Sequence, residues 1–343
     1  MLLSKAKKIV LTPPYLHRYQ TKKLHISLFC LSLCALSVFS ACSSTNPASI
    51  LSNDTSSQQT PSTSITTRDT TAKVLQPQAS AITAVSSSDG NAIIDTSNSN
   101  NGYVMIQYTG DNPKVKVSIE KKGSSDSEPP YTYIIKDYQN YNVYPLSLGN
   151  GDYSIQVLEQ ASQDMYATIL QADTTITLTN EYSPFLYPNA YVNFNLQSAT
   201  VAKGVELATG ASNDIEVICH IFDFVTANIS YDDQLAATVE SGYISDVDRT
   251  LASQKGICFD YASLMAAMLR SQGIPTKLVF GHVGELYHAW ISCYTDETGW
   301  MEKIIEFNGK DWEMLDPTFW ANSNGKRQSV VGDGTNYQAK YIY

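Results

Sequence analysis

Short runs in which apolar and polar residues alternate fill the chain between residues 80 and 183, a pattern typical of β-strands with one buried face. Turn sequences such as Asp89-Gly90 and Gly149-Asn150-Gly151 separate these runs. Many short strands at this spacing predict an all-β sandwich domain over residues 80–183. The strands that we expect are 92–94, 103–108, 114–120, 131–136, 142–145, 153–158, 166–170 and 175–178.

Beyond residue 190 the pattern changes to a mixture of helical and alternating segments. Apolar residues at helical spacing predict helices over 213–229 and from about residue 258 to 273. The second helix should end at Gly273-Ile274-Pro275, because Gly followed by Pro stops a helix. Three alternating runs then predict antiparallel strands: 288–294, 300–307 and 312–315. The predicted fold class is α+β, with the all-β sandwich first and an α+β domain over residues 190–343 second.

The first 41 residues have the character of an export signal. They carry six Lys or Arg and no acidic residue, and they include an apolar run over 26–41. Small residues precede Cys42, although Phe39 stands where a lipobox usually has Leu. This predicts a lipoprotein signal peptide over residues 1–41, cleaved before Cys42 and lipidated on the Cys42 thiol. The alternative is an uncleaved anchor, but about 16 mixed residues are short for a membrane-spanning helix.

Residues 42–79 differ in composition from the rest of the chain. Ser, Thr, Asn, Gln and Pro dominate this segment, and it contains no aromatic residue. Such a composition cannot bury enough apolar surface to fold, so we expect a disordered Ser/Thr-rich tether. With the signal peptide, it predicts an extracytoplasmic protein held to the cell membrane by its lipid anchor.

Net charge narrows the classes of partner. The chain has 23 basic and 33 acidic residues, and removal of the six basic residues of the signal leaves 17 against 33, a formal charge of −16. This balance excludes nucleic acid as a partner and excludes binding to a membrane through basic residues. The expected partners are an extracellular protein or peptide substrate and, through the lipid anchor, the membrane.

The cysteines favour a working thiol over a disulfide framework. Cys219, Cys258 and Cys293 remain once the signal and the lipidated Cys42 are set aside, and three is an odd number. A bridge between Cys219 and Cys293 stays possible. No Cys-x-x-Cys or His-Glu-x-x-His motif occurs, so we predict neither a metal site nor a cofactor.

Three short segments together offer the parts of a nucleophilic site. Cys258 lies in Gly256-Ile257-Cys258-Phe259-Asp260-Tyr261-Ala262, His288 in Tyr287-His288-Ala289-Trp290 and Asp316 in Leu315-Asp316-Pro317-Thr318. Cys258 falls in the first turn of the predicted helix, where unpaired N–H groups and the helix dipole favour a thiolate. Each residue taken alone has an ordinary alternative: a small buried thiol, a core histidine and an Asp-Pro turn.

The order of these three residues, with their flanking sequences, resembles the transglutaminase-like superfamily, a relative of the papain-type cysteine peptidases. The resemblance covers roughly residues 210–320. It implies a helix that carries the nucleophile at its N-terminus and packs on an antiparallel sheet. It also implies catalytic roles for Cys258 as nucleophile, His288 as base and Asp316 as the group that orients His288. In that family a side chain upstream of the Cys helps to stabilise the oxyanion, and Tyr231 and Tyr243 are the candidates here.

The resemblance favours a cysteine peptidase or amidase, because water is the default acceptor outside the cell. Two alternatives remain within the same fold: a transglutaminase that transfers the acyl group to an amine, and a non-catalytic surface module for binding or assembly. A third alternative is carbohydrate binding by the sandwich. All four Trp lie at residue 290 or beyond, so the sandwich lacks the side chain best suited to stack on a sugar.

Overall fold

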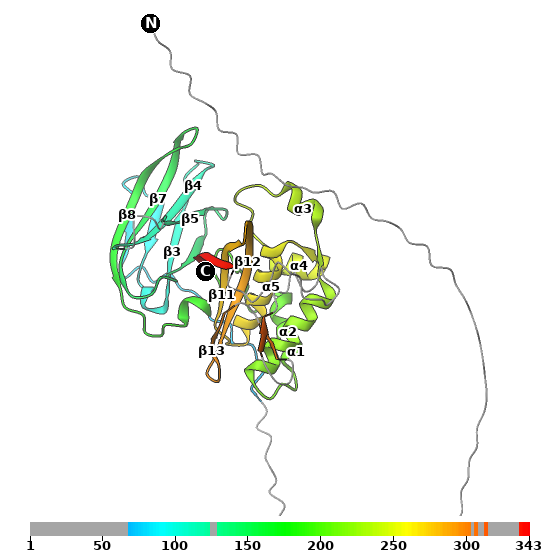
Figure 1. The fold of residues 1–343 in the computed structure, drawn as a ribbon. Helices are drawn as coiled ribbons and strands as arrows, with labels where there is room; N and C mark the ends of the chain where they lie inside the picture. Colours follow the sequence, from blue (N-terminus) through cyan, green and yellow to red (C-terminus); the bar gives the residue numbers. More distant parts are fainter. Residues whose placement is uncertain (1–67, 124–128, 303–304, 308–311, 315–335) are drawn as a thin grey trace, which may run out of the picture. The chain divides into compact units, whose positions relative to one another are not determined.

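The computed structural model describes residues 68–123, 129–302, 305–307, 312–314 and 336–343 (Figure 1). These residues belong to one compact unit, Ser62–Tyr343. The predicted signal peptide and Cys42 lie outside the described residues. None of the helices in the described residues combines the length and the apolar character that a membrane span requires.

The first part of the described chain consists of two four-stranded antiparallel sheets, which confirms the predicted all-β region. One sheet has the order β1-β2-β3-β6 and the other the order β5-β4-β7-β8. The strands of the first sheet are β1 (Ala84–Ser86), β2 (Ala92–Asp95), β3 (Tyr103–Tyr108) and β6 (Tyr141–Pro145). Those of the second are β4 (Val115–Lys121), β5 (Tyr131–Ile134), β7 (Gly151–Ser162) and β8 (Met165–Ile176).

Alternation along the strands matches burial. In β4, Val115, Val117 and Ile119 are at most 2% exposed, whereas the residues between them are partly exposed. The rings of Tyr133 on β5 and Tyr144 on β6 lie 4.8 Å apart and join the two sheets. One expectation was wrong: 166–170 and the start of 175–178 belong to a single strand, β8, which ends at Ile176. The polar residues that interrupt the apolar pattern there are tolerated because β8 is an edge strand.

Helices dominate the chain from residue 199 to 271, and the longest two were predicted. Their bounds are α1 (Ala199–Ala208), α2 (Asp214–Asn228), α3 (Asp233–Thr238), α4 (Val247–Ser253) and α5 (Cys258–Ser271). Asn213 caps α2 by accepting from the backbone N–H of Glu216 at 2.9 Å. At the C-terminal end of α5, Gly273 adopts φ +75°, and the backbone N–H of Ile274 donates to the Leu269 carbonyl at 3.0 Å. This is a Schellman ending, so the Gly-Ile-Pro stop is confirmed.

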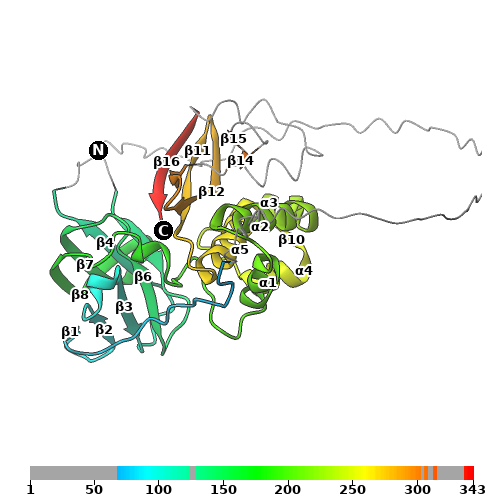
Figure 2. The same ribbon diagram turned by 90° about the horizontal axis from the view of Figure 1, so that it is seen from below.

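A four-stranded antiparallel sheet follows α5 and packs on it, as expected (Figure 2). Its order is β13-β12-β11-β16, from β11 (Thr276–Val283), β12 (Leu286–Thr295), β13 (Gly299–Met301) and β16 (Tyr337–Ile342). Two small sheets pair β9 (Ser230–Tyr231) with β10 (Lys255–Gly256), and β14 (Ile305–Phe307) with β15 (Trp312–Met314). The run predicted as one strand over 300–307 is therefore divided between two sheets.

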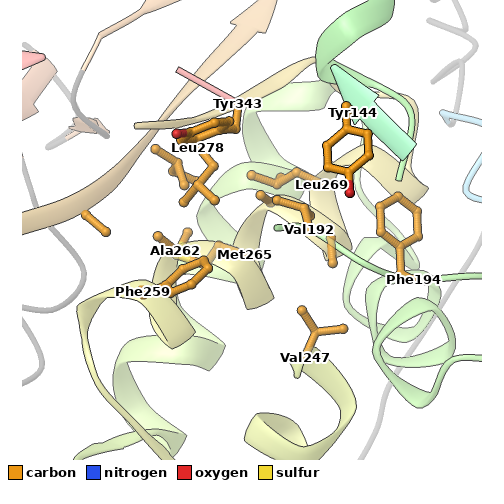
Figure 3. Close-up of a cluster of buried hydrophobic side chains, with 14 of the residues drawn as sticks. Tyr144, Val192, Phe194, Val247, Phe259, Ala262, Met265, Leu269, Leu278 and Tyr343 are labelled. Carbon is orange, nitrogen blue, oxygen red and sulfur yellow. The ribbon is translucent and has the colours of Figure 1, made fainter. Parts of the chain in front are cut away.

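Helix α5 forms the centre of the hydrophobic core. All of its residues except Cys258 are buried. Figure 3 shows Phe259, Ala262, Met265 and Leu269 of this helix among side chains that come from distant segments. Tyr144 of β6 and Tyr343 lie in the same cluster, so the N-terminal sheets and the helical region share one core.

Residues 68–79 form an ordered segment where the sequence predicts a flexible tether. The Arg68 guanidinium lies 2.5 Å from the Asp214 carboxylate and donates to the backbone carbonyl of Gln272. The Lys73 backbone N–H donates to the Ser271 carbonyl at 2.7 Å, and Val74 packs against the core. Composition misses this because the segment is held by hydrogen bonds to the C-terminal end of α5 and not by a core of its own.

Candidate active site

Cys258 is the first residue of α5, as the sequence predicts. The residue before it, Ile257, is the N-cap, and its backbone N–H donates to the Asp260 carboxylate at 2.9 Å. Asp260 is 1% exposed, so this hydrogen bond is sheltered from water. The Asp260 backbone N–H donates to the Ile257 carbonyl at 2.9 Å. The N–H groups of Cys258 and Phe259 come before this bond and have no helical carbonyl to bond, so they can stabilise a negative charge beside Cys258.

Gly256 makes room for the start of α5. A glycine beside a nucleophile could also let a substrate backbone approach closely, but Gly256 does not have that role here. A Cβ atom at Gly256 would stand 2.5 Å from the Cβ of Asp260. Any other residue would therefore displace the carboxylate that bonds Ile257. Gly256 is buried and does not line the pocket that contains Cys258.

A hydrogen-bond network supports Asp260 from the side of the preceding loop. The Tyr243 hydroxyl donates to Asp260 at 2.7 Å and accepts from the Arg249 guanidinium at 2.8 Å. Burial and the bond to the Asp260 carboxylate raise the pKa of Tyr243 well above its usual range. Tyr243 is thus engaged with Asp260, which makes it a support of the helix start and weakens it as an oxyanion donor.

Tyr231 is brought beside Cys258 by the small parallel sheet. Tyr231 of β9 pairs in register with Gly256 of β10, and the Asp232 backbone N–H donates to the Gly256 carbonyl at 2.9 Å. Burial, followed by the nearness of Cys258, raises the pKa of Tyr231 to about 12. The phenol therefore stays protonated at neutral pH and can donate a hydrogen bond next to the thiol.

His288 is the third residue of β12, near the strand start as predicted, and is 3% exposed. It pairs in register with Gly281 of β11. A Cβ at Gly281 would lie only 2.0 Å from the Gln338 carbonyl oxygen, so glycine permits β16 to pack closely at this level. The His288 ring stacks with Trp290 at 6.3 Å between centroids and 20° between planes.

Cys258 and His288 line one pocket of about 590 Å³. Aromatic side chains make most of its remaining wall: Tyr191, Tyr231, Tyr243, Phe259, Phe280, Tyr287, Tyr341 and Tyr343. Thr132 of β5 also contributes, so the N-terminal sheets reach the pocket. Sequence reasoning missed these contributions because Thr132 and Tyr343 are separated from Cys258 by more than 80 residues of chain.

Asp316 lies outside the described residues, and its role remains a prediction. The strand before it, β15, pairs with β14. Among described strands, the neighbours of β12 are β11 and β13. In the sheets described, the strand that precedes Asp316 is therefore not a neighbour of the strand that carries His288.

Among the described residues, the other thiols and histidines do not line this pocket, although the His282 ring meets the pocket residue Tyr287 edge-on at 5.4 Å. Cys219, Cys258 and Cys293 are all free, so the possible bridge between Cys219 and Cys293 is absent. Cys293 is 1% exposed, and burial raises its pKa to about 12. His220 contacts the Leu207 carbonyl through Nδ1 at 2.9 Å. Within the described part of the chain, no group of three or more acidic, Cys or His side chains could hold a metal ion.

Asp260 is a supporting residue that a closer reading of the sequence would have found. It follows the N-cap by three residues, the spacing at which a carboxylate reaches back to the N-cap backbone. Arg249 gives no comparable signal, because its contact with Tyr243 depends on the loop between α3 and α4.

Comparison with known sequences identifies the helical region. Residues 201–303 match the family model described as the Transglutaminase-like superfamily. The uncharacterized protein YebA of Bacillus subtilis (strain 168) is 20% identical over 210 residues, which make up 55% of this chain and 26% of YebA. This chain therefore spans about a quarter of the length of that curated relative.

Solved structures show a more distant likeness. A candidate cysteine protease from Cytophaga hutchinsonii is 15% identical, with 71% of this chain and 79% of that chain covered and a TM-score of 0.34. The periplasmic domain of TgpA from Pseudomonas aeruginosa, bound to ethylmercury, is 16% identical, with 74% and 81% covered and a TM-score of 0.32. Red sea bream transglutaminase is 13% identical, with 66% and 49% covered and a TM-score of 0.27.

The family match includes the helix start at Cys258 and the strand that carries His288, and it ends before Asp316. The observed order of α5 and the antiparallel sheet agrees with what the resemblance implies for the fold. Residues 201–303 of this chain are thus a transglutaminase-like superfamily domain.

Proposed function

We propose that this protein is an exported, lipid-anchored cysteine hydrolase that cleaves amide bonds in extracellular protein or peptide substrates. One observation carries the proposal: the thiol at the N-terminus of α5 and the imidazole of β12 line the same pocket. A thiol at a helix N-terminus and an imidazole beside it are the two groups that nucleophilic amide cleavage requires.

In the proposed reaction His288 takes the proton of the Cys258 thiol, and the resulting thiolate attacks the carbonyl carbon of the substrate amide. A C–S bond forms as the π electrons of the carbonyl move to its oxygen. The backbone N–H groups of the first turn of α5 and the Tyr231 hydroxyl donate to the oxyanion. His288 gives its proton to the leaving nitrogen as the C–N bond breaks. His288 then takes a proton from water, whose oxygen attacks the thioester. The C–S bond breaks, and the acid product and the thiolate are released.

Asp316 completes this scheme as the residue that accepts a hydrogen bond from the second ring nitrogen of His288. A carboxylate there would hold the imidazole in the productive tautomer and stabilise its protonated form. The same thioester could instead be opened by a primary amine, which would make the protein a protein-glutamine transglutaminase. Hydrolysis is proposed because water is the more abundant acceptor outside the cell.

Thiol alkylation tests the site without knowledge of the substrate. Mature protein is treated with iodoacetamide over a range of pH, and the modified cysteine is mapped by mass spectrometry. We expect Cys258 to react faster than the other cysteines across this range, because it lies at a helix N-terminus and lines the pocket. Cys219, which is half-buried, is the internal control. Equal rates and equal pH profiles at Cys258 and Cys219 would favour a non-catalytic binding module.

The acceptor is tested on a mixture of unfolded peptides with and without a fluorescent primary amine. New amino termini that appear in wild type and not in Cys258→Ala support hydrolysis. Incorporation of the amine into glutamine residues, without new termini, would support the transglutaminase alternative.

The membrane anchor is a separate part of the proposal and has its own test. Only a thiol accepts the lipid, so Cys42→Ala should lose the added mass and the association with membranes, whereas Ser43→Ala should keep both. A wild-type protein of unlipidated mass would contradict the anchor and leave the proposal for Cys258 untouched.

A further inference from the structure

The pocket that contains Cys258 exposes apolar surface that the fold does not bury. Seven large hydrophobic side chains of the described residues are conspicuously exposed, and three of them line this one pocket. They are Val239, Leu286 and Tyr287, with exposed fractions of 37%, 50% and 52%. Apolar side chains gathered in this way around a cavity commonly mark a binding surface.

The three side chains that line the pocket come from two separate segments of the chain. Leu286 and Tyr287 are the first two residues of β12 and directly precede His288. Val239 is the C-cap residue of α3 and belongs to the loop that leads to Tyr243. A side chain held between them would therefore lie next to the residues proposed to act on the scissile amide.

The Tyr287 ring has a rigid support. It stacks on Phe280 of β11 at 6.3 Å and 22°, and Phe280 in turn meets Phe259 of α5 edge-on at 4.9 Å. Burial, followed by the charges of Tyr341 and Cys258, raises the pKa of Tyr287. Tyr287 is thus half-exposed, fixed by an aromatic stack and close to the thiol.

Charge at the pocket is sparse and negative. Apart from Cys258, His288 and the tyrosine phenols, Glu240 is the one ionisable side chain among the described lining residues. Glu240 is exposed, and no Lys or Arg lines the pocket in the described part of the chain. An acidic substrate side chain would find repulsion here and no cationic partner.

We propose that Val239, Leu286 and Tyr287 form a subsite for a bulky apolar side chain, aromatic or branched aliphatic, on the residue that carries the scissile carbonyl. This inference rests on the proposed function and adds the class of substrate: peptides with an apolar residue at the cleaved position. Acidic residues at that position are disfavoured, because Glu240 faces the same pocket.

The test uses matched electrophiles that react with a thiolate. Phenylalanyl, glycyl and glutamyl chloromethyl ketones share one reactive group, in which the thiolate forms a C–S bond as chloride leaves. Second-order rate constants are measured on the mature protein, with the modified cysteine mapped. The phenylalanyl compound should react about 10- to 100-fold faster than the glycyl compound, the preference expected from burying a side chain of that size. The glutamyl compound should react more slowly than the phenylalanyl one by at least the same factor.

Two variants locate the subsite. Tyr287→Ala should lower the ratio of the phenylalanyl to the glycyl rate by about 5-fold or more, since it removes the largest apolar side chain of the rim. Leu286→Ala should lower it by a smaller factor. Leu196→Ala is the matched control, because Leu196 is 46% exposed and does not line the pocket. Circular dichroism and thermal unfolding check that each variant folds.

The outcomes separate this inference from the proposed function. Selective reaction of Cys258 with iodoacetamide, together with a phenylalanyl-to-glycyl ratio near one, would overturn the subsite and keep the enzyme. Absence of any selectivity for Cys258 would overturn the proposed function itself. A high ratio that is unchanged in Tyr287→Ala and Leu286→Ala would overturn the assignment to these residues.

Discussion

Each end of the pair formed by α5 and β12 contains a cysteine, but the surroundings of the two thiols differ. We call the end with Cys258, which lines a pocket, the open end, and the end with Cys293, which is buried, the closed end. At one end, Cys258 begins α5, Leu286 and Tyr287 begin β12, and all three line a pocket. At the other end, Arg270 of α5 and Cys293 of β12 are at most 1% exposed. There Arg270 donates to the Thr276 carbonyl, and Thr276 pairs in register with Cys293.

This difference shows that burial, and not residue type, separates a thiol that can react from one that only packs. Burial raises the pKa of Cys293 to about 12, so it is protonated at any physiological pH. Burial also lowers the pKa of Arg270 to about 9, which still leaves the guanidinium charged at neutral pH. Both groups at the closed end therefore stabilise the fold. Substitutions at the open end should mainly change the reactivity of Cys258, and substitutions at the closed end should mainly change the free energy of unfolding.

The largest expected effect comes from exchanging the two thiols for alanine. Cys258→Ala should abolish amide cleavage, because no other nucleophile is proposed, and should change the free energy of unfolding by less than about 1 kcal/mol. Cys293→Ala should do the reverse, with activity per folded molecule retained and a stability loss of about 1–2 kcal/mol from the small cavity. Chemical denaturation and peptide cleavage measure both; unchanged cleavage in Cys258→Ala would exclude this site.

Asp316→Asn tests the predicted third member of the triad. The amide would present the wrong partner to His288, so we expect a rate loss on the order of 10³- to 10⁴-fold and slower alkylation of Cys258. Asp311→Asn, which removes the same charge a few residues earlier, should leave both rates nearly unchanged. Similar behaviour of the two variants would mean that another residue orients His288.

At the closed end, Arg270→Met should cause the largest loss of stability. The guanidinium donates to the backbone carbonyls of Thr276, Tyr187 and Tyr343. Its removal takes a buried donor from each of them, although the Tyr343 carbonyl still accepts from the Leu278 N–H. We expect a loss of about 3–5 kcal/mol in the free energy of unfolding. Lys277→Met on the adjacent strand should lose only about 1 kcal/mol, since Glu302, its ion-pair partner, is 57% exposed and the Lys277 contact with the Trp300 ring is a single cation–π interaction. Comparable losses would show that Arg270 has no special part in the core.

The raised pKa of Cys293 predicts a dependence of stability on alkaline pH. Its usual value of 9.0 applies in the unfolded chain and about 12 in the folded one. Above pH 9 the unfolded chain therefore loses a proton that the folded chain keeps, so stability is full below this pH and falls toward pH 12. Between about pH 9 and 10, wild type should lose roughly 1 kcal/mol more than Cys293→Ala. Parallel pH profiles of the two proteins would contradict the burial of this thiol.

Tyr243→Phe should have the smallest effect. It tests how much the Tyr243 hydroxyl contributes to the position of Asp260 at the start of α5. It removes the hydroxyl between Asp260 and Arg249 but leaves the bond from the Ile257 N–H to Asp260. We expect a stability loss of about 1 kcal/mol and alkylation of Cys258 slowed by a few-fold. Tyr153→Phe loses one comparable hydroxyl bond, to the Gly149 carbonyl, and Tyr153 does not line the pocket. Its alkylation rate should match wild type; a slower rate there would point to a general loss of packing.

Much of the open end could be predicted because its signals are local. The apolar spacing after Cys258 and the Gly273 stop define α5, and alternation around His288 defines β12. Tyr231 was a candidate for the site because of its position upstream of Cys258. Local sequence does not show that Thr132 and Tyr343 complete the pocket wall, since each lies more than 80 residues from Cys258 along the chain.

The sequence by itself determined the α+β class, the two longest helices and the three residue types offered to the chemistry, because periodicity, helix stops and motif spacing act over a few neighbouring residues. Only the tertiary structure decided that residues 68–79 are ordered, that Gly256 makes room for Asp260, and that Cys293 is sealed while Cys258 lines a pocket. The physical reason is that burial, and with it the ionisation of a thiol, is set by which distant segments pack around a residue.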